Sequence, residues 1–260
     1  MRMELGVCAG LDLLPTIDEL GFDFIEVNAT TLSQLSDDEF SAALLEYQRY
    51  RIPVRSSNCF FPGTLRLVGA DRDIDQLQHY IDHTMKRMKD LGVEVMVLGS
   101  GASRCFPPDM TYRQAFAQLV ELCRMIAASA DVYDLKVVIE PLNRKETNII
   151  NSVAEAAVFA AAVDHPRIGV LADLYHIMTD GEPLNDLKRL APLDHIHIAT
   201  ADRLVPTTRE DIIPIISILR DIDYQGRVSI EASSEQFRED AALALAHFRA
   251  LTSPDLVVLN

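Results

Sequence analysis

The sequence predicts a single (β/α)8 barrel, the TIM barrel architecture of α/β proteins. Three observations predict it: eight short apolar runs, amphipathic stretches between them, and a length of 260 residues, which suits one such barrel. Short apolar runs are typical of strands buried on both faces, and their alternation with helices indicates a parallel sheet. We therefore expect one (β/α)8 domain over residues 1–260.

The expected elements follow one another without a linker or a low-complexity tract. The eight strands are predicted at residues 3–9, 22–29, 52–58, 93–100, 135–141, 167–173, 193–199 and 226–232. Apolar side chains at three- and four-residue spacing predict helices within 71–91, 111–130 and 234–250. Ser36 with Glu39, and Ser152 with Glu155, have the spacing of a capping box, so we expect helices to begin there too.

An open, doubly wound sheet is the alternative architecture. Such a sheet normally carries a G-x-G-x-x-G turn after its first strand, and the segment CAGLDLL at residues 8–14 does not match it. The segment GSGASR at residues 99–104 lacks the third glycine as well, and it is better explained as a tight turn that leaves a strand. The barrel is therefore favoured.

Composition excludes several classes of partner. The formal net charge of −15 opposes a nucleic-acid-binding protein, which needs a basic surface. No segment approaches 18 uninterrupted apolar residues, so we expect no membrane span. The segment MRMELGVCAG does not resemble a signal peptide. The four cysteines are scattered without a C-x-x-C pair, which favours a reducing, cytoplasmic location.

Possible metal ligands lie at the ends of the last four expected strands. They are Glu140, Asp173, a histidine of the pair His195 and His197, and Glu231. The C-terminal ends of barrel strands meet at one face, where barrel enzymes carry their active sites. Three carboxylates that converge there would repel one another, and a divalent cation removes the difficulty. Ion-paired residues at a barrel rim are the alternative interpretation.

Two details of this metal site can be taken from the sequence. His195 and His197 point to the same face of their strand, and spacing alone does not choose between them. His197 lies nearer the strand end and is favoured as the ligand, which leaves His195 as a core histidine with a hydrogen-bond partner. Carboxylates with one imidazole suit Mn²⁺, Co²⁺, Mg²⁺ or Zn²⁺ without selecting one of them.

Four segments of the sequence resemble a known family. IEPLNRKETN, LADLYH, HIHIATADR and VSIEA are similar to the xylose isomerase-like superfamily of sugar isomerases and epimerases, and most similar to ketose 3-epimerases of the D-tagatose/D-psicose type. The resemblance covers almost the whole chain. It implies that the metal ligands are Glu140, Asp173, His197 and Glu231. It also implies that the substrate contacts are Glu146, His176 and Arg203.

The resemblance further implies the reaction. A metal-dependent enzyme of this kind inverts C3 of a ketose by removing a proton and returning one, through an enediolate that a dication stabilises. Glu140 and Glu231 would be the acid/base pair, while His176 and Arg203 would hold O1 and O2. Glu146 would bind O1 or orient Arg203. The partner is a small sugar, and a homo-oligomer is compatible with these patterns.

The chain departs from the family pattern in two places, and several alternatives stay open. LVPTTRED follows Arg203 where many members have a Gly-rich loop, and the chain has no tryptophan. The same scaffold also serves aldose–ketose isomerases, hydroxypyruvate isomerase, and inosose or dehydroshikimate dehydratases. An AP-endonuclease-like nuclease or an inactive sugar-binding module is disfavoured by the charge and by the intact ligand set. A rim salt bridge with Arg144 or Lys145 is the structural alternative for Glu146.

Overall fold

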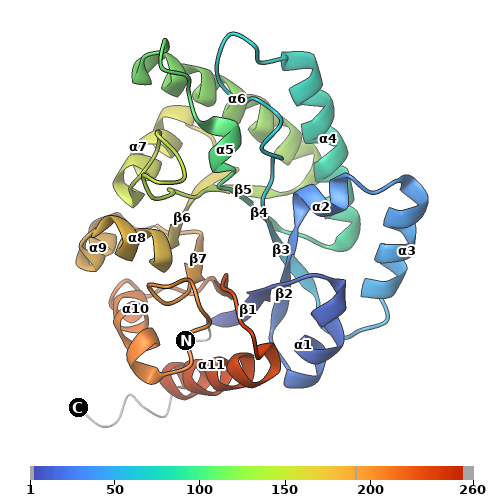
Figure 1. The fold of residues 1–260 in the computed structure, drawn as a ribbon, viewed down its shortest axis with the longest axis vertical. Helices are drawn as coiled ribbons and strands as arrows, with labels where there is room; N and C mark the ends of the chain where they lie inside the picture. Colours follow the sequence, from blue (N-terminus) through green and yellow to red (C-terminus); the bar gives the residue numbers. More distant parts are fainter. Residues whose placement is uncertain (1–2, 191, 254–260) are drawn as a thin grey trace.

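Eight parallel strands close into a barrel in chain order, from β1 to β8 and back to β1. The computed structural model describes residues 3–190 and 192–253 of the chain. Figure 1 shows the helices arranged around these strands. The TIM barrel that the sequence predicts is confirmed.

Every strand falls inside one of the expected runs. The strands are β1 Glu4–Cys8, β2 Phe24–Asn28, β3 Val54–Asn58, β4 Val95–Leu98, β5 Lys136–Ile139, β6 Ile168–Asp173, β7 His195–Ile198 and β8 Arg227–Ile230. Glu140 and Glu231 each come directly after a strand, but their backbone N–H groups still donate to the neighbouring strands, to Leu98 and Ile198 respectively. The ladder therefore holds the backbone of both residues.

Helices follow the strands on the outside of the barrel. The α-helices are α1 Leu14–Leu20, α2 Ala29–Ser33, α3 Asp37–Tyr47, α4 Ile74–Leu91, α5 Gly101–Arg104, α6 Tyr112–Tyr133, α7 Val153–Val163, α8 Leu174–Asp180, α9 Leu187–Leu190, α10 Arg209–Asp221 and α11 Phe237–Thr252. The 3-10 turns η1 Leu11–Leu13 and η2 Leu184–Asp186 complete the set. Within the described part of the chain, no helix has both the length and the apolarity to cross a membrane.

Only one of the two expected capping boxes forms. Ser36 and Glu39 bond reciprocally at the start of α3, as the spacing predicts. At the start of α7, the Ser152 hydroxyl accepts the N–H of Glu155, but the Glu155 carboxylate accepts the N–H of Asn151 at 2.7 Å instead of that of Ser152. Of the second predicted capping box, the Ser152 hydroxyl bond forms but the Glu155 carboxylate bond to Ser152 does not. The chain enters α7 with the N–H of Asn151 nearer that carboxylate.

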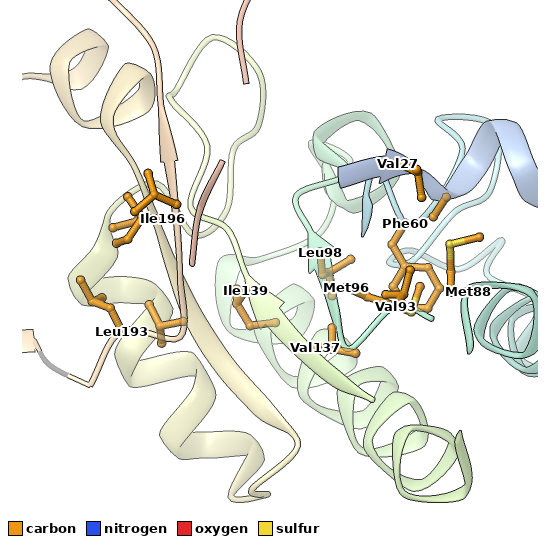
Figure 2. Close-up of a cluster of buried hydrophobic side chains, with 14 of the residues drawn as sticks. Val27, Phe60, Met88, Val93, Met96, Leu98, Val137, Ile139, Leu193 and Ile196 are labelled. Atoms are coloured by element: carbon orange, nitrogen blue, oxygen red, sulfur yellow. The ribbon is translucent and has the colours of Figure 1, made fainter. Parts of the chain in front are cut away.

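Alternation along the strands separates an outer core from the barrel interior. Side chains such as Val137, Ile139 and Ile196 are buried in the main hydrophobic core, part of which Figure 2 shows. The intervening residues face the other way, because successive strand side chains point to opposite faces. On β4, β5 and β6 these are apolar and form a small separate cluster of Val97, Val138 and Leu171.

Most of the remaining interior is polar, although the buried ring of Phe24 also lies there beside His195. β2, β3, β7 and β8 contribute buried side chains that form one hydrogen-bonded group: Glu26, Ser56, His195, His197 and Ser229. A buried polar group is costly unless it is hydrogen-bonded, so these side chains constrain one another. This polar half of the barrel lies beneath the expected metal ligands.

Candidate metal centre

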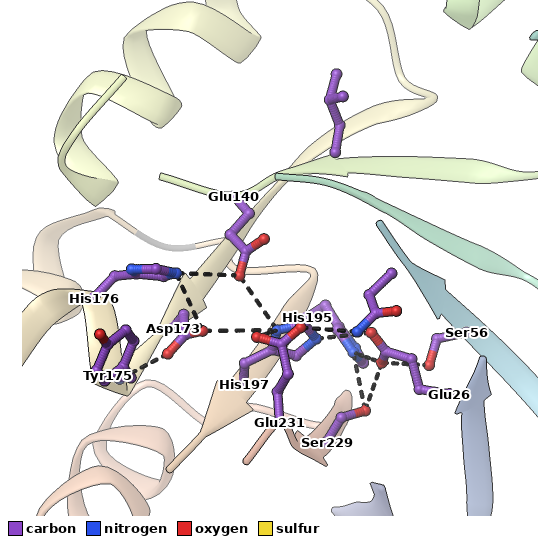
Figure 3. A network of polar contacts seen from close by, with 12 residues as sticks. Glu26, Ser56, Glu140, Asp173, Tyr175, His176, His195, His197, Ser229 and Glu231 are labelled. Carbon is purple, nitrogen blue, oxygen red and sulfur yellow. Dashed lines mark hydrogen bonds and ion pairs between the residues drawn. The ribbon is translucent and has the colours of Figure 1, made fainter. Parts of the chain in front are cut away.

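The four predicted ligands lie together at the C-terminal ends of β5 to β8. Figure 3 shows Glu140, Asp173 and Glu231 directed toward His197. The Nδ1 atom of His197 lies 3.4 Å from Glu140 Oε1, 3.9 Å from Asp173 Oδ2 and 3.6 Å from Glu231 Oε2. One ligand atom from each of the four lies within 4.8 Å of all the others. The structure thus brings together the set that strand-end positions predict.

Electrostatics in this cluster are unfavourable without a cation. Burial, and then the neighbouring Glu231, raise the pKa of Glu140. Burial, and then Glu140 and Glu231, raise the pKa of Asp173 well above its usual value. Like charges at this separation disfavour ionisation, and a divalent cation among the oxygens would reverse that effect.

Unpartnered buried atoms show that a metal ion fits this cluster. Glu140 Oε1, Asp173 Oδ2 and His197 Nδ1 are buried without a hydrogen-bond partner among the described residues. Buried polar atoms are rarely left in this state, and these three are all metal-ligand atoms that point at one place. Three carboxylates and one imidazole are a donor set for a divalent cation such as Mn²⁺, Mg²⁺, Co²⁺ or Zn²⁺.

Asp173 has two tasks, one for each oxygen. It is the N-cap of α8, and its Oδ1 accepts the N–H of Tyr175 at 2.7 Å. Its Oδ2 is then left to face His197 and the other carboxylates. The strand end and the helix start that follows it therefore fix the direction of this ligand.

Glycine after β4 leaves room for Glu140. A Cβ atom added to Gly99 would lie 2.1 Å from Glu140 Oε2, well inside contact distance. The segment GSGASR, expected as a tight turn that leaves a strand, does leave β4 at Gly99, but its last four residues form the short helix α5. The small residue is needed where the carboxylate passes.

Glu26 is a buried residue of the site that the sequence analysis missed. It lies on β2, is fully buried, and its Oε1 is 2.9 Å from His197 Nε2. Burial alone would raise the pKa of Glu26, but the facing His197 and His195 outweigh it and hold that pKa well below its usual value. The signal was available in FDFIEVNA, which places a carboxylate in the middle of a buried strand.

His195 is a core histidine, as expected. Its side chain is fully buried, and its Nε2 lies 2.8 Å from Glu26 Oε2. Burial lowers the pKa of His195, so its imidazole is neutral and donates to the carboxylate. The preference for His197 over His195 as the ligand agrees with the geometry, because it is His197 that reaches the carboxylate cluster.

His176 lies beside the cluster in a defined tautomer. The backbone N–H of Asn143 donates to His176 Nδ1 at 3.1 Å, so the ring hydrogen is on Nε2. That Nε2 is buried without a hydrogen-bond partner among the residues that the structure describes, 4.0 Å from Glu140 Oε1 and 3.8 Å from Asp173 Oδ2. Burial, and then Arg203, lower the pKa of His176 to about 3. The side chain is therefore a neutral donor directed at the site.

Arg203 bridges Glu231, an expected metal ligand, and Glu146, an expected substrate contact. Its guanidinium donates to Glu231 Oε2 at 3.0 Å and to Glu146 Oε1 at 3.4 Å. It also lies over the Tyr175 ring at 4.8 Å, which fixes its plane. Burial would raise the pKa of Glu231, but His197 and Arg203 outweigh it and lower that pKa to about 2. Glu231 is therefore ionised.

Two further side chains complete this side of the site. Asn143 donates to Glu146 Oε1 at 3.0 Å. Arg144, which the sequence offered as a salt-bridge partner of Glu146 at the barrel rim, pairs instead with Asp180 at 2.8 Å.

Asn58 at the end of β3 was not anticipated, and it donates to Glu231 Oε1 at 2.8 Å. The β3 segment ends in a polar residue at the same rim, which was the signal for it.

Comparisons with known proteins agree with this geometry. The model of the xylose isomerase-like TIM barrel family matches residues 14–251. The chain is 27% identical to the D-psicose 3-epimerase of Agrobacterium fabrum over 225 residues, which are 83% of this chain and 76% of that protein. It is 30% identical to a probable ketose 3-epimerase of Synechocystis over 231 residues, 84% of this chain and 77% of that one.

A solved structure shows the same fold. The crystal structure of a D-psicose 3-epimerase in the presence of D-fructose superposes with a TM-score of 0.84 at 24% identity, and the match covers 96% of this chain and 99% of that one. The chain therefore belongs to the xylose isomerase-like TIM barrel family, and it is an enzyme of the isomerase class that is similar to ketose 3-epimerases.

Proposed function

We propose that the chain is a divalent-metal-dependent epimerase that inverts C3 of a ketose. The observation that carries the proposal is the pair Glu140 and Glu231, two carboxylates from β5 and β8 that each place one oxygen beside His197 Nδ1. Figure 3 shows them approaching that point from different sides. Inversion of a carbon needs one acid/base group on each of its faces, and such a pair can supply it.

Glu140, Asp173, His197 and Glu231 would hold the cation. When bound, the ion would polarise the ketose oxygens and offset the negative charge that forms when a proton leaves the carbon next to the carbonyl. We propose Mn²⁺, Co²⁺, Mg²⁺ or Zn²⁺ for this role, since each accepts this set of donors.

Proton movement is then the work of the two carboxylates. One of them takes the hydrogen of C3 as a proton, and the electron pair of the C–H bond moves into the C2 carbonyl to give an enediolate. The other carboxylate, protonated, returns a proton to C3 on the opposite face, and the C2 carbonyl reforms. Glu231 accepts donors at both oxygens and is held ionised, which suits a base.

His176 and Arg203 would position the C1–C2 end of the ketose. The neutral Nε2–H of His176 and the guanidinium of Arg203 both donate, so they bind the oxygens O1 and O2 and favour their negative charge. Glu146 lies against Arg203 at 3.4 Å and would orient it or accept the O1 hydroxyl. With O1 and O2 held there, C3 lies between the carboxylates.

We propose that the ketose is not phosphorylated. Arg203 is already engaged by Glu146 and Glu231, and Arg104, another basic residue near the site, is buried and bonds the backbone carbonyls of Leu98 and Ile150. Arg203 is assigned to O1 and O2, and Arg104 is buried, so neither guanidinium is placed to bind a phosphate at the far end of the sugar.

Deuterium incorporation tests the proposed reaction. The metal-loaded enzyme in deuterated water, supplied with a free ketose, should place deuterium at C3 of both epimers, because each turnover returns a solvent proton there. NMR of the recovered sugars measures the position. Label at C1 with none at C3 would instead show an aldose–ketose isomerase, and loss of water from the sugar would show a dehydratase.

A further inference from the structure

The side chain of Glu26 lies in the polar half of the barrel, on the opposite side of the His197 ring from the three carboxylate ligands. It is fully buried and accepts hydrogen bonds at both oxygens. We propose that Glu26 is a positioning residue that fixes His197 with its hydrogen on Nε2, so that Nδ1 is free to bind the metal ion. The inference rests on the metal site proposed above and goes beyond it.

The geometry of the imidazole gives the first step. His197 Nε2 lies 2.9 Å from Glu26 Oε1, while His197 Nδ1 lies 3.4 Å from Glu140 Oε1. A histidine that binds a metal ion through Nδ1 keeps its single ring hydrogen on Nε2, and a carboxylate that faces Nε2 can accept that hydrogen. Glu26 faces Nε2 of His197, and Nδ1 faces the other ligands, so the ring is oriented for this mode of binding.

The second step is the rigidity of Glu26 itself. Its Oε2 accepts from Ser56 Oγ at 2.7 Å, from Ser229 Oγ at 2.7 Å and from His195 Nε2 at 2.8 Å. These donors come from β3, β8 and β7, so three strands hold the carboxylate in one orientation. Oε1 is thereby presented to His197 before any ion arrives, which reduces the cost of ordering the ligand.

The third step is the chemistry of the carboxylate. All four neighbours donate, and only a carboxylate offers acceptors at both oxygens. A glutamine of the same shape would direct an NH₂ group at one or more of these donors and would remove the negative charge. That charge makes the imidazole a stronger ligand, as outer carboxylates do at other histidine–metal sites.

The same arrangement explains why both histidines are present on β7. His195 and His197 are two residues apart, share one face of the strand, and bond opposite oxygens of Glu26. Figure 3 shows both rings beside Glu26. His197 is the ligand, and His195 braces the carboxylate that orients it.

Metal affinity tests the proposal with Glu26→Gln and a matched control. The control is Glu94→Gln, which removes one negative charge at the other end of the barrel, where Glu94 pairs with Arg55 and Arg227. We expect titration calorimetry of the chelator-treated full chain to show a dissociation constant for Mn²⁺ about 10–100-fold higher in Glu26→Gln, and the wild-type value in Glu94→Gln.

The outcomes separate this inference from the proposed function. A folded Glu26→Gln chain that binds Mn²⁺ as tightly as the wild type overturns the role of Glu26 and leaves the metal site intact. A wild-type chain that binds no divalent cation overturns both.

Nitrogen-15 NMR of histidine gives a second readout that does not depend on the variant folding. In the wild-type chain loaded with diamagnetic Zn²⁺, we expect the His197 hydrogen on Nε2, in slow exchange and shifted downfield by the Glu26 carboxylate. Among the residues of the four-ligand group His197 is the histidine, so the imidazole whose Nδ1 signal shifts when Zn²⁺ is added is assigned to it. A hydrogen on Nδ1 of His197, or one in fast exchange with water, would contradict the inference.

Discussion

At the residue scale, the two proposed acid/base carboxylates occupy different environments. Glu231 is hydrogen-bonded at both oxygens, by Asn58 and by Arg203. Glu140 has one buried oxygen that finds no hydrogen-bond partner within the described part of the chain, and its pKa is raised by burial and by Glu231. Environments that push apart the pKa values of two carboxyl groups are typical of an acid and base pair. Their roles can therefore be separated by neutralising each in turn.

Glu140→Gln and Glu231→Gln should each reduce net epimerisation by a factor of about 10²–10⁴, because one face of C3 then lacks its acid/base group. Each variant should still exchange the C3 hydrogen of one epimer with deuterated water, from the face whose carboxylate survives. NMR follows the sugars, and Glu94→Gln is the control, with wild-type turnover. Wild-type epimerisation in either site variant would refute the assignment.

At the scale of the element, the segments that follow the strands decide which way the ligands point. Asp173 caps α8 with one oxygen and faces the cluster with the other. Gly99, directly after β4, provides the space into which the Glu140 carboxylate extends. The strand ends therefore carry the candidate ligands, and the segments that follow the strands orient their carboxylates.

Gly99→Ala should therefore weaken Mn²⁺ binding at least tenfold without unfolding the chain. The new methyl group would lie 2.1 Å from Glu140 Oε2 and would push that carboxylate away from His197. Gly10→Ala, two residues after β1, is the matched control, because its methyl group would meet only the exposed, flexible carboxylate of Asp12. Calorimetry measures both. Equal affinities in the two variants would show that Gly99 is not needed for the position of Glu140.

At the scale of the whole molecule, the two ends of the barrel have different tasks. The C-terminal end holds the candidate metal centre. At the other end, Arg227 pairs with Glu4 at 3.0 Å and with Glu94, which also pairs with Arg55. These pairs join the starts of β1, β3, β4 and β8. In barrels of this type the N-terminal end contributes stability rather than chemistry.

Metal binding should stabilise the whole barrel, because the ligands come from four strands. At an Mn²⁺ concentration about 100 times the dissociation constant, the free energy of unfolding should rise by about 2.7 kcal/mol, which is roughly 5–10 °C in Tm. A chelator should reverse the shift and abolish turnover. The Asp173→Asn variant, which keeps a capping oxygen but loses a charged ligand, should show a much smaller shift. An unchanged Tm and full activity in chelator would refute the metal site.

The Glu94 pairs should stabilise the barrel in a pH-dependent way. Burial would raise the pKa of Glu94, but Arg227 and Arg55 outweigh it and lower that pKa. Its stabilisation is therefore present above the unfolded pKa of about 4.3 and is lost as pH falls through the lower folded value.

Glu94→Gln should accordingly lower Tm at pH 7 by about 1–3 °C, since partly exposed pairs contribute about 0.2–1 kcal/mol, and this difference should shrink below about pH 4. Thermal unfolding monitored by circular dichroism at several pH values measures it, with the exposed Glu235→Gln as control. A difference that grows toward acid pH would contradict the pairing.

The sequence by itself predicted the eight strands, their alternation with helices and the four candidate metal ligands, because these depend on local patterns. Strand alternation and the position of Glu140, Asp173 and Glu231 at strand ends are visible within a few residues. The place of each ligand on the barrel follows from strand order, since consecutive parallel strands are neighbours. The choice of His197 also follows, because it lies nearer the strand end.

Only the tertiary structure decided which buried side chains meet across the barrel. Glu26 contacts His197 over a separation of 171 residues, and Asn58 contacts Glu231 over 173. Such contacts depend on barrel closure, which brings β2 and β3 opposite β7 and β8. The periodic pattern of apolar residues within one strand or helix does not indicate which distant side chains will meet. The partner of the Glu155 carboxylate was misassigned for a related reason: capping depends on how the chain enters the helix, and not on spacing alone.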